Sequence, residues 1–213
     1  MSTALQVAGG LGIYRLKCTN FRKILKPSAK TLLLTGDCLT VGQSYETVTK
    51  EFMLYLQANW KQVIYIPGRS ELRAPGAAVS LYSHLYPNVK FAYRTHYPLG
   101  SIYTVIGATY LTTSDSVWAS KEAQWVCETL GSEVRPVILA SYCPLPKDTH
   151  TDNIAALVHG TGKNQFCPTK PIVNVYSDYN GELRSDYNPE FVLELQSPAA
   201  ETAIMCAWLA ARD

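Results

Sequence analysis

The sequence predicts an α/β protein with a large sheet content, built as one domain. Short runs of β-branched and aliphatic residues recur along the chain, and several are apolar at nearly every position, as in "TLLLTG" (31–36). Such strands are typically buried on both faces, under helices or under a second sheet. Segments of helical periodicity lie between some of these runs, which is typical of an α/β chain. At 213 residues the chain is long enough for one full domain with a sizeable core.

The expected elements follow from these patterns in order along the chain. Strands are predicted over 11–16, 31–36, 62–67, 101–111, 136–142, 154–160, 171–177 and 191–196. Helices are predicted over 44–60, 76–87 and 120–131. In the first of these, Val48, Phe52 and Leu56 recur at four-residue steps, which gives the helix one apolar face.

The domain boundaries follow from the outermost of these elements. We expect residues 1–10 to form an N-terminal extension and residues 11–196 to form the domain. The last segment, 197–213, follows a loop break and favours a helix, which either clasps the domain or docks a partner.

Composition excludes several classes of function. Nineteen Lys and Arg against seventeen Asp and Glu give a formal net charge of +2, too small to indicate nucleic acid or an acidic membrane as a partner. No window approaches the apolar length that a membrane span needs. The six cysteines show no C-x-x-C pair or disulfide-framework spacing, so reduced thiols are expected. We therefore expect a protein that is not secreted, located inside a cell or a particle assembled there.

Short motifs follow the predicted strands. Gly-Asp stands at 36–37 in "LLLTGDCLTVG", Gly-Arg-Ser-Glu at 68–71 in "IPGRSE", Ser-Tyr at 141–142 in "VILASYCP", and "LVHGTGK" ends at 163. In this order and spacing the motifs resemble those of the calcineurin-like metallophosphoesterases, which hydrolyse phosphate esters with two metal ions. The resemblance covers residues 11–195. It implies a single-domain metallophosphoesterase-like β-sandwich flanked by helices, with four layers in the order α/β/β/α.

Most of the positions that bind metal in that family hold other residues here. The resemblance places these at Leu16, Cys18, Arg69, Ser141, Tyr142, Thr161 and Lys163, and it leaves Asp37 as the retained metal-bridging residue. It also places Ser70 where the family has the histidine that contacts the phosphate. Two-metal hydrolysis needs ligands from several strand ends, and a single carboxylate does not hold a dinuclear centre. We therefore expect no catalytic residue, no metal site and no cofactor.

Cations replace some of the lost ligands. Arg69 and Lys163 occupy former ligand positions, and Lys17 lies beside the first one. A buried carboxylate needs a counter-charge, so we expect Asp37 to pair with Arg69 or Lys163. Arg69, Lys163 and Lys17 would then line the former cleft, where they either have no ligand or bind a weak anion such as phosphate.

These features predict a catalytically inactive protein that serves as a structural or binding component of a larger assembly, for example a capsid or a ribonucleoprotein. Other proteins of that assembly would bind through the C-terminal helix and the turn-rich loop 175–189. The alternatives are a residual or altered phosphoesterase that uses Asp37, and an anion-binding module in the former cleft. A thiolate nucleophile among Cys18, Cys38 and Cys143 is weighed against buried, inert cysteines.

Overall fold

Two five-stranded sheets form the centre of the molecule in a computed structural model. The structure describes residues 3–13, 20–39, 46–72, 84–109, 116–143, 153–160, 172–174 and 187–195. The first sheet has the order β10-β1-β2-β3-β4 and consists of β1 (Thr3–Gly9), β2 (Thr31–Thr35), β3 (Gln62–Ile66), β4 (Val89–Phe91) and β10 (Val192–Leu195). The second has the order β5-β6-β7-β8-β9 and consists of β5 (Thr95–Leu99), β6 (Tyr103–Ala108), β7 (Val137–Ser141), β8 (Ile154–His159) and β9 (Ile172–Asn174). Each sheet is parallel except for one antiparallel edge strand, β10 in the first and β5 in the second.

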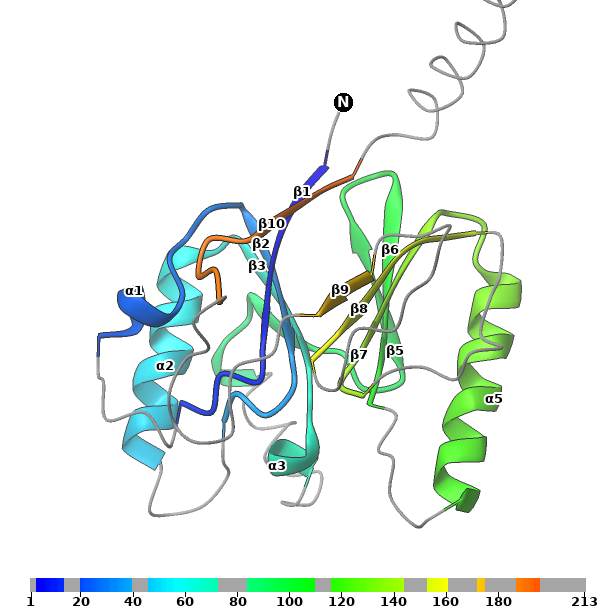
Figure 1. Ribbon diagram of the computed structural model, residues 1–213, viewed down its shortest axis with the longest axis horizontal. Coiled ribbons are helices and arrows are strands. Elements are labelled where there is room, and N and C mark those ends of the chain that lie inside the picture. The colour runs from blue at the N-terminus through cyan, green and yellow to red at the C-terminus, as the bar shows by residue number, and fades with distance from the viewer. Residues whose placement is uncertain are drawn as a thin grey trace, which may run out of the picture.

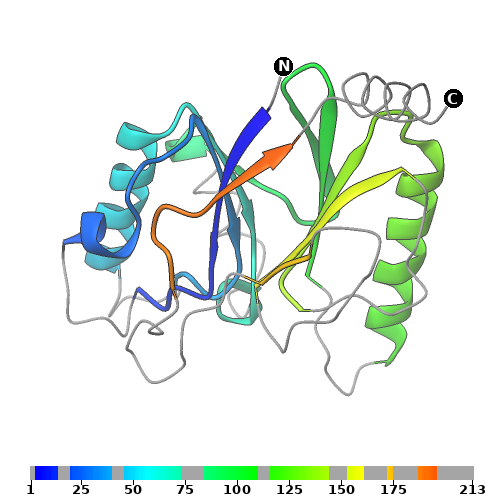
Figure 2. The same ribbon diagram turned by 45° about the horizontal axis from the view of Figure 1, so that its top comes forward.

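Helices cover the outer faces of the two sheets. The short α1 (Phe21–Ile24) and the longer α2 (Glu46–Asn59) lie outside the first sheet, and α5 (Ser116–Ser132) lies outside the second (Figure 1). Figure 2 shows the same order of layers from an oblique direction. The predicted β-sandwich flanked by helices, with layers α/β/β/α, is therefore confirmed.

The strands are apolar at successive positions because both faces of each sheet are buried. In β2, Leu32 and Leu34 pack in the cluster under α2 that contains Phe52 and Leu56. Leu33, between them, packs in the cluster between the two sheets. A third cluster lies between the second sheet and α5 and contains Val126, Leu130 and Leu139. Alternate side chains thus enter different cores, which is why no polar alternation marks the sequence of β2.

The first strand lies earlier in the chain than predicted. β1 spans Thr3–Gly9 and pairs with β2 and β10, so these residues belong to the sheet and not to an N-terminal extension over 1–10. The strand predicted over 11–16 is wrong in its described part, because Leu11 and Gly12 lie beyond the end of β1. Gly10 and Gly12 both have positive φ, at 58° and 52°, which turns the chain out of the strand there.

A buried glutamine in the middle of β1 hides this strand in the sequence. Gln6 has no exposed surface, and its amide Nε2 donates to the carbonyls of Lys26 and Pro189 at 2.7 and 2.9 Å. Its Oε1 accepts hydrogen bonds from Ser28 N and Trp60 Nε1, both at 2.9 Å. Because the side chain is fully hydrogen-bonded, its burial carries no desolvation penalty of the kind that unpaired amides incur.

Most other predicted elements are confirmed within one to four residues of their ends. β2, β3, β6, β7, β8 and β10, and the helices α2 and α5, lie where the sequence predicted strands and helices. The strands β4 and β5 and the short helices α1 and α3 (Arg69–Leu72) were not predicted. Of the helix expected over 76–87, residues 84 and 85 are helical and 76–83 lie outside the described residues. The C-terminal helix expected over 197–213 and the loop 175–186 also lie outside them, as does most of the strand expected over 171–177.

The two halves of the molecule end their main helices in the same way. Asn88, just before β4, donates from Nδ2 to the carbonyl of Trp60 at 2.7 Å, one residue beyond α2. Asn153, just before β8, donates from Nδ2 to the carbonyl of Leu130 in α5 at 3.1 Å. Each asparagine satisfies a carbonyl that a helix end leaves without a partner. The two hydrogen bonds thus tie the start of β4 to the end of α2 and the start of β8 to α5.

Within the described part of the chain, no helix combines the length and the apolar character needed to cross a membrane.

Candidate functional site

The carboxyl ends of the parallel strands lie along one edge of the sandwich, the edge that carries α3 in Figure 1. In the first sheet Gly9, Thr35 and Ile66 are in register at the ends of β1, β2 and β3. In the second sheet Ser141 and His159 are in register at the ends of β7 and β8. The segments that follow these strands therefore converge, as at the ligand-binding edge of other open parallel sheets.

Asp37 lies at the centre of this edge. It follows β2 directly after Gly36, and both residues have positive φ, at 47° and 56°. The Asp37 side chain is 9 % exposed. Its Oδ1 accepts a hydrogen bond from Ser70 N at 2.7 Å, and its Oδ2 accepts one from the Tyr142 hydroxyl. Asp37 thus joins the segments that follow β2 and β3 in the first sheet to the end of β7 in the second.

Glu71, in α3, fixes the loop that carries Asp37. Its side chain is 2 % exposed and accepts hydrogen bonds from the Tyr65 hydroxyl and from backbone N–H groups at 2.8–3.0 Å. These N–H groups belong to Asp37, Cys38, Leu39 and Gly68. Three consecutive amides after β2 therefore converge on one carboxyl group that is anchored after β3.

Burial sets the protonation of this cluster. It raises the pKa of Glu71 above its ordinary value, and the hydrogen bonds from the Tyr65 hydroxyl and from Leu39 N oppose that shift. Burial, and then the neighbouring Glu71, raise the pKa of Tyr65 well above the ordinary value. Tyr65 is therefore a neutral phenol that donates a hydrogen bond to Glu71.

Two glycines allow these loops to touch. A Cβ atom on Gly36 would lie 2.2 Å from Cδ2 of Tyr142, and one on Gly68 would lie 2.4 Å from the backbone N of Asp37. Neither distance is compatible with a side chain. The glycines of the Gly-Asp and Gly-Arg-Ser-Glu motifs are thus required by close packing around Asp37.

The segment after β1 brings no side-chain donor to Asp37 in its described part. Gly10 N donates to the carbonyl of Gly36 at 2.8 Å, and Gly12 N donates to the carbonyl of Asp37 at 2.9 Å. The resemblance placed Leu16 and Cys18 at the first lost metal ligands, but the strand end lies at Gly9. The residues that actually flank the Asp37 loop are two glycines, and Leu16 and Cys18 lie outside the described residues.

The expected ion pair between Asp37 and Arg69 is not present. Arg69 is exposed at the start of α3, and the ion pairs among the described residues are Lys26–Glu190 and Glu133–Arg135. Asp37 satisfies its oxygens with a neutral hydroxyl and an amide, which leaves the guanidinium of Arg69 free to remain in water. Lys163 and Lys17, the other predicted cations, lie outside the described residues.

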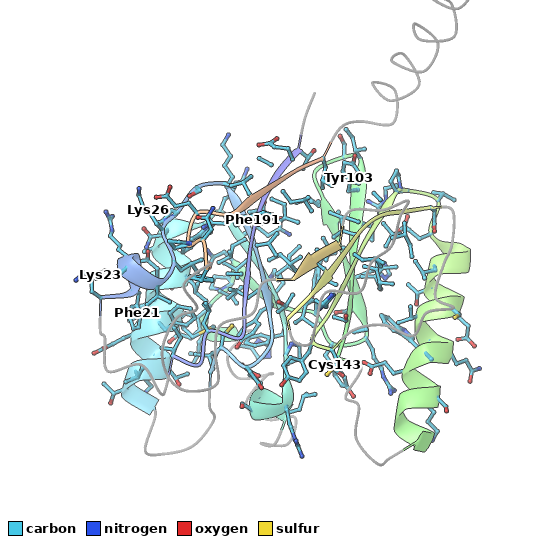
Figure 3. All side chains as sticks on the ribbon, in the orientation of Figure 1. Phe21, Lys23, Lys26, Tyr103, Cys143 and Phe191 are labelled. Atoms are coloured by element: carbon cyan, nitrogen blue, oxygen red, sulfur yellow. The ribbon has the colours of Figure 1, made fainter. Side chains whose placement is uncertain are left out.

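The two described cysteines near the site, Cys38 and Cys143, are buried and do not have the exposed position of a nucleophile. Cys38 has no exposed surface, and its Sγ donates to the carbonyl of Gly36 at 3.4 Å. Burial, and then the charge of Glu71, raise the pKa of the Cys38 thiol well above its ordinary range, which disfavours the thiolate. Cys143 is also buried, at the edge near α3 (Figure 3), and Cys18 lies outside the described residues.

Tyr142 is the functional contact that the sequence did not reveal. Its position was identified as a former metal-ligand position, but the expected replacement for the metal was a cation. The phenol is 4 % exposed and reaches Asp37 from the opposite sheet. The sequence did place a tyrosine directly after a predicted strand, in one of the motifs that also include Asp37, and this could have suggested the hydroxyl as the partner of Asp37. In the described part of the chain, no three His, Cys, Asp or Glu side chains lie close enough to one another to hold a metal ion.

Replacing Tyr142 with phenylalanine tests this contact. The variant leaves Asp37 Oδ2 buried without its donor, so we expect the free energy of unfolding to fall by about 1–3 kcal/mol. Denaturant unfolding measures the loss, and a double-mutant cycle with Asp37→Asn isolates the pairwise contribution. The control is Tyr97→Phe, which removes a half-buried hydroxyl bonded to a backbone carbonyl at 3.2 Å and should cost less. Equal losses for the two tyrosines would contradict a special role for Tyr142.

Comparisons with known proteins identify the fold. A scan against models of protein families found no match, and a search of curated proteins found none. Among solved structures, TT1561 of Thermus thermophilus is similar at 12 % identity, with 82 % of this chain and 89 % of that chain covered and a TM-score of 0.56. Another crystal structure is similar at 14 % identity, with 82 % and 90 % covered and a TM-score of 0.50. The chain thus shares the fold of these structures over most of its length, a mixed α/β fold with two facing sheets flanked by helices, as the motif resemblance implied.

Proposed function

We propose that this protein is a catalytically inactive relative of the metallophosphoesterases and serves as a structural or binding component of a larger protein assembly. The observation that carries the proposal is the contact between Asp37 and Tyr142. In the family that the motifs resemble, the carboxylate at this position bridges two metal ions. Here one of its oxygens accepts a tyrosine hydroxyl and the other a backbone amide.

The residues around Asp37 support the loss of metal chemistry. Two-metal catalysis depends on several anionic or imidazole ligands that surround both ions. The segment after β1 offers Gly10 and Gly12, the one after β3 offers the exposed Arg69, and the one after β7 offers Tyr142. The Tyr142 hydroxyl occupies one lone pair of Asp37 Oδ2 and places a phenol ring beside that oxygen, where the family has a metal ligand. A two-metal centre would therefore need several ligands beyond those that the described residues place around Asp37.

The packing around the site supports a role for the fold itself. Glu71 holds the Asp37 loop with a full set of hydrogen bonds, and Gly36 and Gly68 keep the loops in contact. These features maintain the shape of the edge without themselves supplying a base, a nucleophile or a metal. An edge whose described residues hold its shape in this way suits a component of an assembly.

Metal content and hydrolysis test the inactive state. The protein and its Asp37→Asn variant would be purified from cultures supplemented with manganese and zinc, and their metal would be measured by mass spectrometry. We expect less than stoichiometric metal and equal, background hydrolysis of phosphate monoesters and diesters by both proteins. Two bound transition-metal ions per chain, or hydrolysis that Asp37→Asn abolishes, would instead identify a residual phosphoesterase.

Partner binding tests the assembly role separately. The native complex would be isolated from its source and its composition measured, and we expect other proteins in fixed ratio to this chain. Deletion of residues 197–213 should reduce their recovery if the C-terminal segment docks them. A protein recovered only as a free monomer would overturn the assembly role. A phosphate-dependent rise in melting temperature that Arg69→Gln abolishes would favour an anion-binding module instead.

A further inference from the structure

Exposed basic side chains lie on α1, on the segment that joins α1 to β2, and directly before β3. They define what we call the α1 basic surface: Arg22, Lys23, Lys26, Lys30 and Lys61, all exposed. Figure 3 shows Lys23 and Lys26 on the outer side of the molecule, away from α5. Lys30 and Lys61 immediately precede β2 and β3, so they lie at the opposite edge of the first sheet from Asp37. The small net charge of the chain hides this local concentration of cations.

Hydrogen bonds hold the backbone of this surface in place. The Tyr55 hydroxyl donates to the carbonyl of Leu25 at 2.6 Å, and Gln6 Nε2 donates to that of Lys26 at 2.7 Å. Lys61 N donates to the carbonyl of Lys30 at 2.9 Å, and this hydrogen bond holds the two lysines next to each other at the start of β2 and β3. The cations are therefore carried on a fixed backbone, which reduces the ordering cost of binding a ligand.

Most of this positive charge is not neutralised by the described residues. Segment 20–30 contains no acidic residue. Lys26 forms an ion pair with Glu190, and the two side chains remain 62 % and 43 % exposed. The other four cations form no ion pair with a described residue. Glu51 on α2 is exposed and pairs with none of them among the described residues. The surface therefore presents a field that attracts a polyanion.

The apolar side chains near this surface select among polyanions. Phe21 and Trp60 are 7 % and 3 % exposed, and Leu25 has no exposed surface. Tyr55 is half-buried, and its ring packs against those of Phe21 and Trp60. These four side chains thus form a packed apolar layer beneath the cations and do not project as a stacking platform or as an anchor for a membrane. Protein interfaces are depleted in lysine and centre on desolvated apolar anchors, whereas nucleic-acid interfaces are strongly positive. A surface of exposed cations over buried apolar side chains therefore fits the phosphates of a duplex better than single-stranded bases, a membrane or a protein.

We propose that the α1 basic surface binds the phosphate backbone of duplex nucleic acid without reading its base sequence. The contacts are charge-assisted hydrogen bonds from lysine and arginine to phosphate oxygens. This binding does not depend on the Asp37 site, because Lys30 and Lys61 lie at the opposite ends of β2 and β3 from Asp37, and Arg22 and Lys23 lie on α1, outside the sheet (Figure 1). Duplex binding goes beyond the proposed function, because it adds nucleic acid to the proteins that this chain would bind in an assembly.

Salt-dependent binding to labelled duplex DNA and duplex RNA tests the proposal. Fluorescence anisotropy should show weak binding that falls steeply with salt, with a log–log slope on DNA of about −3 to −4 for the four cations outside the Lys26–Glu190 pair. The variant carrying Lys23→Gln and Lys30→Gln should move that slope toward about −2, because it removes two phosphate contacts. A duplex of scrambled sequence should bind with the same affinity and the same salt slope. The control is Lys121→Gln on α5, an exposed lysine on the far side of the molecule that should leave affinity and slope unchanged.

Three outcomes would overturn the assignment. The first is the absence of duplex binding at low salt. The second is an equal loss of affinity from Lys121→Gln and from the Lys23 and Lys30 substitutions. The third is preferential binding to polyglutamate or to vesicles rich in phosphatidylserine, which would assign the surface to an acidic protein or to a membrane. The substituted side chains are all exposed, so an unchanged melting temperature confirms that each variant is folded.

Discussion

Replacement of Glu71 by glutamine is expected to lower the free energy of unfolding by about 4 kcal/mol, because buried hydrogen-bond donors lose a charged acceptor. Oε1 accepts from Cys38 N, Leu39 N and the Tyr65 hydroxyl, and Oε2 accepts from Asp37 N and Gly68 N. Glutamine presents an NH₂ group in place of one of these oxygens. In either orientation that group faces backbone N–H donors, which are left buried without an acceptor.

Denaturant unfolding of the Glu71→Gln protein measures this loss. A domain of this size is stable by about 5–15 kcal/mol, so the expected effect is a large fraction of the total. Tyr65→Phe provides a milder variant, since it removes one donor and should cost about 1–2 kcal/mol. Glu51→Gln, at an exposed position on α2, is the matched control and should change stability little. A Glu71→Gln protein as stable as the Glu51→Gln protein would show that the Asp37 loop is held by other contacts.

The fold was predictable because its strongest signals are local. Leu32, Leu33 and Leu34 are apolar in succession because alternate residues enter two different cores, and this pattern is visible in a few letters of sequence. The turn motifs at Asp37 and Glu71 likewise lie within short segments directly after strands. Local patterns of this kind predicted most of the strands, and the family resemblance carried by the short motifs implied the layers and the place of the site.

The errors arose where distant partners decide the structure. Gln6 breaks the apolar run of β1, and its burial depends on the carbonyls of Lys26 and Pro189, which lie 20 and 183 residues away. The partner of Asp37 was wrong for the same reason. Charge alone favoured the nearby Arg69, whereas Tyr142 reaches Asp37 across 105 residues from the other sheet. Neither contact leaves a local mark, so a single sequence does not reveal it.

The last residue of this site with a large expected effect is Gly160, at the end of β8. A Cβ atom there would lie 2.2 Å from the carbonyl oxygen of Thr35 and 3.0 Å from its carbonyl carbon. Those atoms belong to the end of β2, so the backbones of the two sheets touch at this point. Because a strand backbone does not move aside as a flexible side chain would, Gly160→Ala should lower stability by about 3 kcal/mol or more.

Gly131→Ala is the matched control for this prediction. Gly131 lies near the end of α5, and a Cβ atom there would meet nothing within 4 Å. Alanine is favoured over glycine in helices by about 0.5–1 kcal/mol, so this variant should be slightly more stable than the wild type. Opposite signs for the same substitution would assign the effect of Gly160 to the contact between the sheets, whereas two small effects of equal sign would contradict it.

The close approach at Gly160 also bears on Asp37. Gly160 N lies 3.1 Å from the carbonyl oxygen of Tyr142, so a displacement of β8 acts directly on the residue that holds Asp37. Once Gly160→Ala has separated the sheets, the Tyr142 hydroxyl should contribute less to stability. The loss caused by Tyr142→Phe should therefore be smaller in the Gly160→Ala background than in the wild type, and thermodynamic cycles measure that difference. Strictly additive losses would mean that the tyrosine reaches Asp37 independently of the spacing between the sheets.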